Sequence, residues 1–388
     1  MQGLDYRRMN VGKNMNLLWL SGRVIGSDMA GTTEEMLCSN LRLLGNEVVL
    51  ISPGRLEQPS IEHISIPRIG IQGLETLTAA RNIGKVLKEK KERFMLFDVV
   101  LVDWRFVRML RNDLEKLGIP WIIIDRGPPV TSGIFGKGIK RELLRNLQKI
   151  FWKSAWKEAG RTSIGGFVVS GEHSKLVRKL CNDKPIGIIP AGSVKNKYLA
   201  TKSDVSELLK ISYVGRIDRK RGLQKIIDFS ESLNTYGVEH HITFAGEGDL
   251  GSKFSEFNSD KFSNVGKISQ DEVMVLLAEQ HVGIMPMPDL PIWRIASPLK
   301  LAEYLASGLA IVGPSHPGNR VGENEQWNLL SENNWWSDCA KKLSELAKEN
   351  TGWESRFVFP AIESSKSLMW DIIALKMSKD IKLMKAGL

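Results

Sequence analysis

The chain has 388 residues, of which 42% are hydrophobic and 25% charged, a composition that excludes a disordered chain and is typical of a globular protein. This length corresponds to roughly two or three domains. The net charge of +10 is uneven: residues 1–190 carry 30 Lys and Arg against 19 Asp and Glu, whereas the remainder carries 24 against 25. We therefore expect acidic partners for the first half, namely anionic lipid, a phosphate-bearing acceptor or nucleic acid.

The cysteines and the early apolar residues indicate a cellular compartment. Cys38, Cys181 and Cys339 lie far apart and form no Cys-x-x-Cys pair, which favours a reducing compartment and argues against a metal cage. The apolar run at residues 15–20 is too short for a signal peptide or a membrane span. We expect a cytoplasmic protein, and peripheral association with the inner face of a membrane stays open.

Short apolar segments alternate with helical segments along the first 190 residues. Helices are expected, for example, at residues 32–44 and 76–90. This alternation predicts a parallel sheet covered by helices on both faces. The strands are expected at residues 15–20, 47–51, 97–102, 121–124, 166–169 and 186–189.

A second series of the same kind follows the polar segment at residues 191–210. Its strands are expected at residues 211–214, 241–244, 282–285 and 309–312, and its helices include residues 223–233 and 271–279. The fold class is therefore α/β, with two doubly wound, Rossmann-like domains facing across a cleft. The expected boundaries are residues 1–190, residues 191–359, and a C-terminal helical segment at 360–388 that crosses back to the first domain.

Residues 297–312 combine a loop, a short helix, a glycine and an apolar strand. Ser297 is a good N-cap, and Pro298 suits the first helical turn, where a missing N–H costs nothing. Gly308 is expected to end the helix in the left-handed conformation. Such a helix start favours phosphate, and the carboxylate of Glu303 beside it suits a ribose hydroxyl. A packing helix whose glutamate faces water explains the same residues equally well.

The segment at residues 213–222 runs from a strand into a glycine turn with cations five positions apart. Gly215 lets the backbone approach a ligand, and Arg216 and Arg221 could clamp a diphosphate with their forked donors. A basic surface turn is the alternative. Glycines also follow the next strand, at residues 244–249.

Taken in order, residues 213–222, 244–249, 264–268 and 297–312 resemble the C-terminal domain of GT-B glycosyltransferases. The resemblance is to glycosyltransferase family 4, whose members use nucleotide-sugar donors and retain the anomeric configuration. Its most specific motif here is Ser-Pro-Leu-Lys-Leu-Ala-Glu-Tyr-Leu-Ala-Ser-Gly. The resemblance is close over residues 211–330 and looser elsewhere.

By position, the resemblance implies that Arg216 contacts the donor diphosphate, that Arg221 occupies the second cationic position, and that Glu303 binds ribose. Residues 266–268 would face the nucleobase, and residues 297–299 would hold phosphate through backbone N–H groups. The further donor-binding residues implied are Gly215, Lys220, Gly246, Gly266, Lys267, Ile268, Ser297, Pro298 and Leu299.

Two positions depart from the family pattern. Arg221 replaces the usual lysine, which keeps the charge but changes the geometry. Ile295 stands where the fuller motif has a second glutamate, eight positions before Glu303. Asp289 is a candidate substitute near the sugar.

The N-terminal half resembles the family less closely. Residues 21–34 are similar to the first glycine-rich loop, in which Gly31 would approach the sugar and phosphates; a plain strand–helix connection is the alternative. Asp125 follows a predicted strand where many relatives have a histidine lining the acceptor site. Asp125 could bind a sugar or acceptor hydroxyl, or it could cap the next turn.

Cations recur every four residues from 137 to 161, with apolar residues between them. A surface for an anionic membrane and a packed helix with solvated cations both fit this pattern. The cations are Lys137, Arg141, Arg145, Lys149, Lys153, Lys157 and Arg161; the apolar residues are Leu143, Leu144, Leu147, Ile150, Phe151, Trp152 and Trp156.

These features predict a retaining glycosyltransferase that moves a sugar from a nucleotide-sugar donor to a hydroxyl of a glycan or lipid-linked acceptor. No metal or other cofactor and no nucleic acid are expected, since no metal-ligand spacing is present. The catalytic prediction covers Arg216, Arg221 and Asp125. The alternatives are an inverting transferase or nucleotide-sugar epimerase on the same fold, and a non-enzymatic module that binds membrane or nucleic acid through the basic half.

Overall fold

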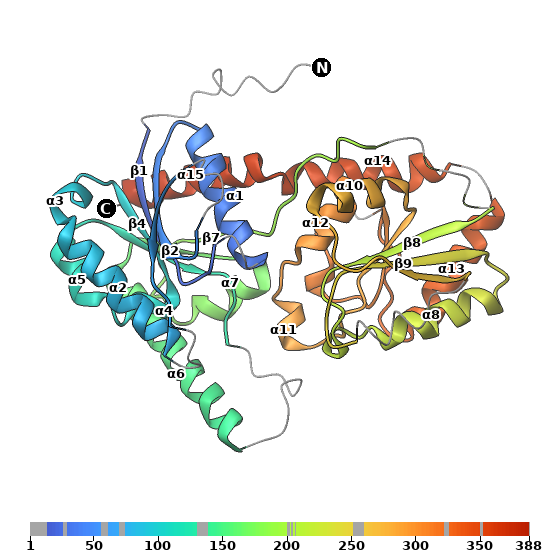
Figure 1. The fold of residues 1–388 in the computed structure, drawn as a ribbon, viewed down its shortest axis with the longest axis horizontal. Helices are drawn as coiled ribbons and strands as arrows, with labels where there is room; N and C mark the ends of the chain where they lie inside the picture. Colours follow the sequence, from blue (N-terminus) through green and yellow to red (C-terminus); the bar gives the residue numbers. More distant parts are fainter. Residues whose placement is uncertain are drawn as a thin grey trace. The chain divides into compact units, whose positions relative to one another are not determined.

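The computed structural model describes residues 14–25, 29–55, 61–69, 74–129, 139–199, 202, 205, 207–250, 260–321, 326–349 and 352–387. The chain divides into two compact units, the first within Met1–Pro190 and Trp370–Leu388 and the second within Ala191–Met369. Each unit is built on its own parallel sheet with helices packed on it (Figure 1).

The sheet of unit 1 has seven parallel strands in the order β3-β2-β1-β4-β5-β6-β7. Its central strands are continuous apolar runs because both faces are covered by helices, and Leu18 of β1 lies between Val49 of β2 and Val100 of β4. The strands are β1 (Asn16–Leu20), β2 (Glu47–Pro53), β3 (Glu62–Ile66), β4 (Val99–Asp103), β5 (Trp121–Asp125), β6 (Gly165–Val168) and β7 (Ile186–Ile188).

The helices of unit 1 include one from the end of the chain. α15 (Trp370–Ala386) packs against α1 (Met29–Leu43), and Lys385 near its end forms an ion pair with Asp98. The expected C-terminal helical segment at 360–388 is broken: α14 (Phe359–Ser365) and a 3-10 turn (Lys366–Leu368) precede α15. The other helices are α2 (Glu75–Glu89), α3 (Lys91–Phe94), α4 (Trp104–Val107), α5 (Arg111–Leu117), α6 (Ile139–Thr162) and α7 (Gly171–Arg178).

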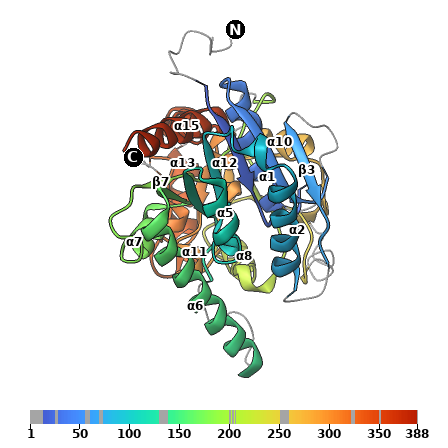
Figure 2. The same cartoon turned by 90° about the vertical axis from the view of Figure 1, so that its left-hand side faces the viewer.

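Helix α6 extends beyond the body of unit 1 (Figures 1 and 2). Its second half packs on the sheet through Trp152 and Trp156, which are both buried. Leu143, Leu147 and Ile150 in its first half are 60%, 54% and 64% exposed. The packed-helix interpretation therefore holds only for the second half. Lys137 and the side chains of Arg141 and Leu144 lie outside the described residues.

The sheet of unit 2 has five parallel strands in the order β10-β9-β8-β11-β12. They are β8 (Leu209–Val214), β9 (His240–Ala245), β10 (Phe262–Asn264), β11 (Val282–Ile284) and β12 (Ala310–Val312). The α-helices are α8 (Gln224–Thr235), α10 (Gln270–Glu279), α11 (Pro291–Arg294), α12 (Leu299–Ala306), α13 (Trp335–Glu349) and α14; shorter turns are Arg219–Arg221, Pro317–Asn319 and Glu354–Val358.

All ten predicted strands are present, with ends shifted by at most two residues, and two further strands were missed. β3 and β10 are edge strands, and most of their residues are only partly buried. An edge strand needs no continuous apolar run, so these segments carried no strand signal. None of the helices in the described part of the chain is long and apolar enough to cross a membrane.

Candidate functional site

The glycine turns after β8, β9 and β10 come together at the carboxyl end of the unit 2 sheet. Gly215 and Gly246 have φ of +124° and +145°, a region that disfavours other residues. The Gly246 N–H donates to the Gly266 carbonyl at 2.7 Å, and a Cβ on Gly246 would lie 2.0 Å from the Gly215 carbonyl oxygen. β8 and β11 flank the point where strand order reverses, where doubly wound sheets bind ligands. The predicted glycines therefore form one backbone-lined surface.

Arg216 and Arg221 lie in the loop after Gly215, and both face Asp218. The Arg216 Nε donates to Asp218 Oδ2 at 2.8 Å, and the Arg221 Nε is 3.9 Å from the same oxygen. The Arg216 side chain is 61% exposed, whereas that of Arg221 is 25% exposed and lies over the Trp293 ring. The hydrogen bond from Arg216 holds the pKa of Asp218 below its usual value. Asp218, which the sequence interpretation did not single out, is the counter-ion of both arginines.

Lys300 is the functional candidate that the sequence interpretation missed. It is buried in the first turn of α12, and its Nζ has no hydrogen-bond partner among the described residues. The Nζ lies 4.0 Å from the centroid of the Tyr213 ring and 3.2 Å from where a Cβ on Gly215 would stand. Burial, and then Arg221, hold its pKa well below 10.5, although Glu303 acts in the opposite direction. Apart from the Tyr213 ring face, the buried Lys300 Nζ has no hydrogen-bond acceptor among the described residues, and burying a charge without such a partner is unfavourable.

The start of α12 differs from the prediction. The helix begins at Leu299 with Pro298 at the N-cap, and the Ser297 hydroxyl instead accepts from the Ala191 N–H at 2.8 Å. The predicted capping by Ser297 is wrong, because that side chain ties down the first residue of unit 2. Pro298 has no N–H and cannot donate to phosphate. Gly308 ends the helix with φ of +69°, which confirms the predicted stop.

Glu303 lies one turn further along α12. Its Oε1 accepts from the Gln270 Nε2 at 2.8 Å, and burial raises its pKa. Lys267 is exposed, and Ile268 packs against the apolar core beneath α12. The Gly266 N–H donates to the side chain of Asn264 at 3.0 Å.

The remaining polar candidates of unit 2 are on the surface. Lys220 is exposed in the 3-10 turn that carries Arg221. Asp289 forms a bidentate ion pair with Arg294, with both oxygens 2.9 Å from the Nη1. Arg294 therefore occupies both carboxylate oxygens of Asp289 in this structure. Ile295 caps α11.

Asp125 is a structural residue, which corrects the catalytic prediction. It is fully buried, and its Oδ2 accepts from Trp152 Nε1 at 2.5 Å and Trp156 Nε1 at 2.9 Å and lies 3.2 Å from His173 Nε2. Its Oδ1 accepts from the Gly127 N–H at 3.1 Å. Both oxygens are therefore occupied by interior donors, and no substrate can reach them in this arrangement.

Gly31 also has a different role from the predicted one. It lies inside α1 and is buried, and a Cβ there would stand 2.6 Å from the Val24 carbonyl oxygen. Glycine is required at this position because the backbone of the preceding loop passes so close. The predicted approach to a sugar is thus replaced by a packing contact.

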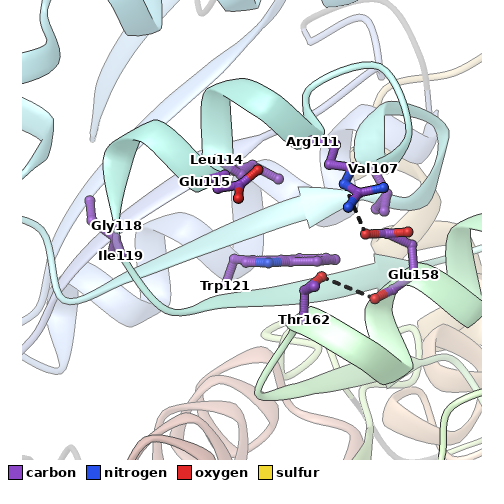
Figure 3. Close-up of a pocket in the computed structure, with 9 residues that line it drawn as sticks. All are labelled: Val107, Arg111, Leu114, Glu115, Gly118, Ile119, Trp121, Glu158 and Thr162. Carbon is purple, nitrogen blue, oxygen red and sulfur yellow. Dashed lines mark hydrogen bonds and ion pairs between the residues drawn. The ribbon is translucent and has the colours of Figure 1, made fainter.

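A pocket of about 230 Å³ lies elsewhere in unit 1, along α5 and α6 (Figure 3). Arg111 points into it and pairs with Glu158, with 3.3 Å between Nε and Oε1. Trp121, at the start of β5, forms part of its wall. The pocket contains none of the predicted site residues, and we assign it no function. Among the described residues, no three His, Cys, Asp or Glu side chains are grouped to hold a metal ion.

Known structures share this architecture over nearly the whole chain. Sucrose-phosphate synthase from Thermosynechococcus elongatus has a TM-score of 0.74 at 14% identity, covering 97% of this chain and all of that one. The chain has the GT-B fold. Anabaena HepE, solved with UDP and glucose, has a TM-score of 0.66 at 13% identity, covering 97% of this chain and all of that one. WaaG, a glycosyltransferase of lipopolysaccharide biosynthesis, has a TM-score of 0.65 at 13% identity, covering 94% of this chain and 98% of that one.

The predicted resemblance to GT-B glycosyltransferases is confirmed at the level of the fold. No protein-family model matches the chain. No curated protein matches it either.

Proposed function

We propose that this GT-B protein is a glycosyltransferase that transfers a sugar from a nucleoside diphosphate sugar to a hydroxyl acceptor. The observation that carries the proposal is the buried, unpartnered Lys300 ammonium beneath the glycine turn at Gly215, with Arg221 and Arg216 in the same loop region. The cations and the backbone of the three glycine turns suit a diphosphate. The UDP complexes of HepE support the same ligand class.

The cations would act on the leaving group. As the bond between the anomeric carbon and the phosphate oxygen breaks, negative charge develops on the diphosphate, and fixed positive charges stabilise it. The acceptor oxygen forms the new bond on the same face, so configuration is retained, and its proton passes to the departing phosphate oxygen. No metal is needed in this scheme. An inverting route would require a separate base, and Asp125, the base candidate from the sequence, is buried with both carboxylate oxygens hydrogen-bonded.

Thermal-shift measurements test the donor assignment. UDP, GDP and ADP, each alone and as its sugar derivative, are added to the purified chain, and a ligand that binds the native state raises its melting temperature. UDP is the first choice because of the HepE complexes. The absence of a shift with every nucleotide would contradict the proposal.

Glu303 provides a point test of the ribose contact. The Oε1 of Glu303 accepts from the Gln270 Nε2 at 2.8 Å, and a carboxylate offers further lone pairs that can accept from a ribose hydroxyl. We expect Glu303→Ala to weaken nucleotide binding by roughly tenfold to a hundredfold, the value of a charged hydrogen bond. Calorimetric titration with UDP measures this affinity, and Glu279→Ala, at an exposed position of α10, is the control. Equal affinity of Glu303→Ala and the parent would assign Glu303 to packing.

We further propose that the first half of α6 contacts an anionic membrane, where a lipid-linked acceptor would lie. Leu143, Leu147 and Ile150 share one helix face and are more than half exposed. The exposed cations Lys149 and Lys153 follow on the same helix. An exposed apolar stripe bordered by lysines suits the boundary between headgroups and acyl chains.

Flotation with lipid vesicles tests the membrane contact. We expect binding to vesicles of phosphatidylcholine with phosphatidylglycerol, and weak binding to phosphatidylcholine alone. Changing Leu143, Leu147 and Ile150 together to Ser should weaken binding of the protein to these vesicles on the order of a hundredfold. The change removes the exposed apolar surface of the three side chains that the bilayer would otherwise bury. Leu43→Ser with Leu96→Ser, at exposed leucines elsewhere in unit 1, is the control. Equal binding to vesicles with and without phosphatidylglycerol would contradict this proposal.

A further inference from the structure

A second group of charged side chains lies at the carboxyl end of the unit 1 sheet. Arg23 follows β1, Asp103 ends β4, and Arg126 follows β5. Strand order reverses between β1 and β4, so Arg23 and Asp103 stand at the switch point where doubly wound sheets bind ligands, and Arg126 follows the adjacent strand. Gly31, predicted to approach the sugar and phosphates, and Asp125, predicted to bind a sugar or acceptor hydroxyl, are both engaged in packing. The charged group is a separate polar feature of that edge.

Glu34 is the buried member of the group. It projects from α1, is 2% exposed, and its Oε2 has no hydrogen-bond partner among the described residues. Its pKa is raised to about 7 by burial and by Asp103, while a hydrogen bond from Ser21 and the charges of Arg23 and Arg126 lower it. A carboxyl that is buried without full pairing is unfavourable unless a ligand or a proton completes it.

The Arg23 guanidinium lies beside the backbone of Gly127, the residue that follows Arg126. The charge of Arg23 contributes to lowering the pKa of Arg126 to about 10, after burial, and Arg23 Nη2 is 3.8 Å from where a Cβ on Gly127 would stand. Arg126 Nη1 donates to the Ile189 carbonyl at 3.3 Å. Both side chains are partly exposed. Two partly exposed cations held near each other favour an anion that contacts both.

We propose that Arg23 and Arg126 bind an anionic group of the acceptor, a phosphate or a carboxylate, and that Glu34 is the titratable group beneath this site. The identification of the ligand as the acceptor depends on the proposed function, whereas the anion site itself does not. The acceptor class would then be a hydroxyl compound with an anionic group, such as a sugar phosphate or a uronic acid.

Glu34 links this site to pH. An anion bound to Arg23 and Arg126 offsets part of the positive charge that favours the ionised form of Glu34. The pKa of Glu34 therefore rises further, and anion binding is accompanied by uptake of a proton. Affinity therefore falls as pH rises through about 7. The charged or titratable groups that surround Glu34 in the described residues are Arg23, Asp103 with its partner Arg105, Arg126, and Glu35 and Cys38 on its own helix.

Calorimetric titration of the full chain tests the site. Glucose 6-phosphate and glucuronate distinguish the two anions, and glucose is the neutral comparison. We expect one of the anions to bind, and Arg23→Gln and Arg126→Gln each to weaken it roughly tenfold to a hundredfold. Lys300→Met, in the other unit, should leave it unchanged. Binding that survives both arginine changes, is lost in Lys300→Met, or occurs with neither anion would overturn the proposal.

Sulfate serves for the pH series because its own charge is constant between pH 6 and 8. We expect its affinity to fall on the order of fivefold across this range in the parent. The Glu34→Gln variant should bind sulfate with about equal affinity at pH 6 and pH 8, and at pH 8 it should bind sulfate more tightly than the parent. A purely structural Glu34 would leave the slope unchanged in the variant, which would remove it from the site. UDP binding, measured separately, reports on the proposed function alone.

Discussion

Lys300→Met is expected to stabilise the ligand-free protein and to remove its response to nucleotide. The Nζ of Lys300 is buried without a hydrogen-bond partner in the described structure, so the native state carries a desolvation penalty. Replacing buried ion pairs by apolar side chains of similar volume is often neutral or stabilises proteins by about 1–4 kcal/mol, and we expect a gain within that range for Lys300→Met. In a domain of this size each kcal/mol raises the melting temperature by about 2–4 °C.

The same change should lower nucleotide affinity. If the diphosphate partners the Lys300 ammonium, its loss raises Kd roughly tenfold to a hundredfold, the range for a hydrogen bond between charged groups. Lys341→Met, at an exposed position of α13 in the same unit, should change neither quantity. A stabilised variant with unchanged UDP affinity would remove Lys300 from the donor site.

The stabilisation should also depend on pH. The folded pKa of Lys300 lies well below 10.5, so near that pH the unfolded chain binds more protons than the native one, and native stability rises with pH. The penalty is fully present below the folded pKa and vanishes above 10.5. The advantage of Lys300→Met is therefore expected to shrink as pH increases toward 10.5, which urea unfolding at a series of pH values measures.

The elements of this GT-B chain were largely predictable because its central strands are buried on both faces. A strand such as Val99–Asp103 is apolar throughout and is visible without any knowledge of its neighbours. The glycine turns were visible for a related reason: Gly215 and Gly246 adopt φ values that few other residues tolerate. Because the backbone conformation at these positions favours glycine, a glycine in the sequence predicts the turn.

Side-chain roles were less predictable, because distant residues determine them. Lys300 is significant only through its place beneath Gly215, 85 positions earlier in the chain. The donors that occupy Asp125 come from Trp152, Trp156 and His173, and no local spacing connects them with β5. The fourfold spacing of cations indicated helix α6, but could not show that its first half leaves Leu143 and Ile150 exposed.

Asp125→Ala is expected to destabilise unit 1 more than any other single change considered for it. Three side-chain groups, from Trp152, Trp156 and His173, meet one buried carboxylate oxygen, and removing the carboxylate leaves buried polar groups unpaired. Such losses cost about 3–5 kcal/mol. Asp125→Asn should also destabilise, because a carboxamide lacks the charge that these donors stabilise. Glu115→Gln, at an exposed position of α5, is the control, and urea unfolding is the measurement.

The pH dependence of the free energy of unfolding at acid pH provides a second test of Asp125. Burial alone would raise the pKa of Asp125, but the interactions with His173 and the two indole N–H groups lower it below 3.8. A group whose folded pKa is depressed stabilises fully above its unfolded pKa and loses its effect as pH falls through the folded value. The difference in stability between the parent and Asp125→Ala should thus be constant at neutral pH and should narrow below about pH 3.8. Unchanged stability with lost transfer activity would instead restore the catalytic interpretation of Asp125.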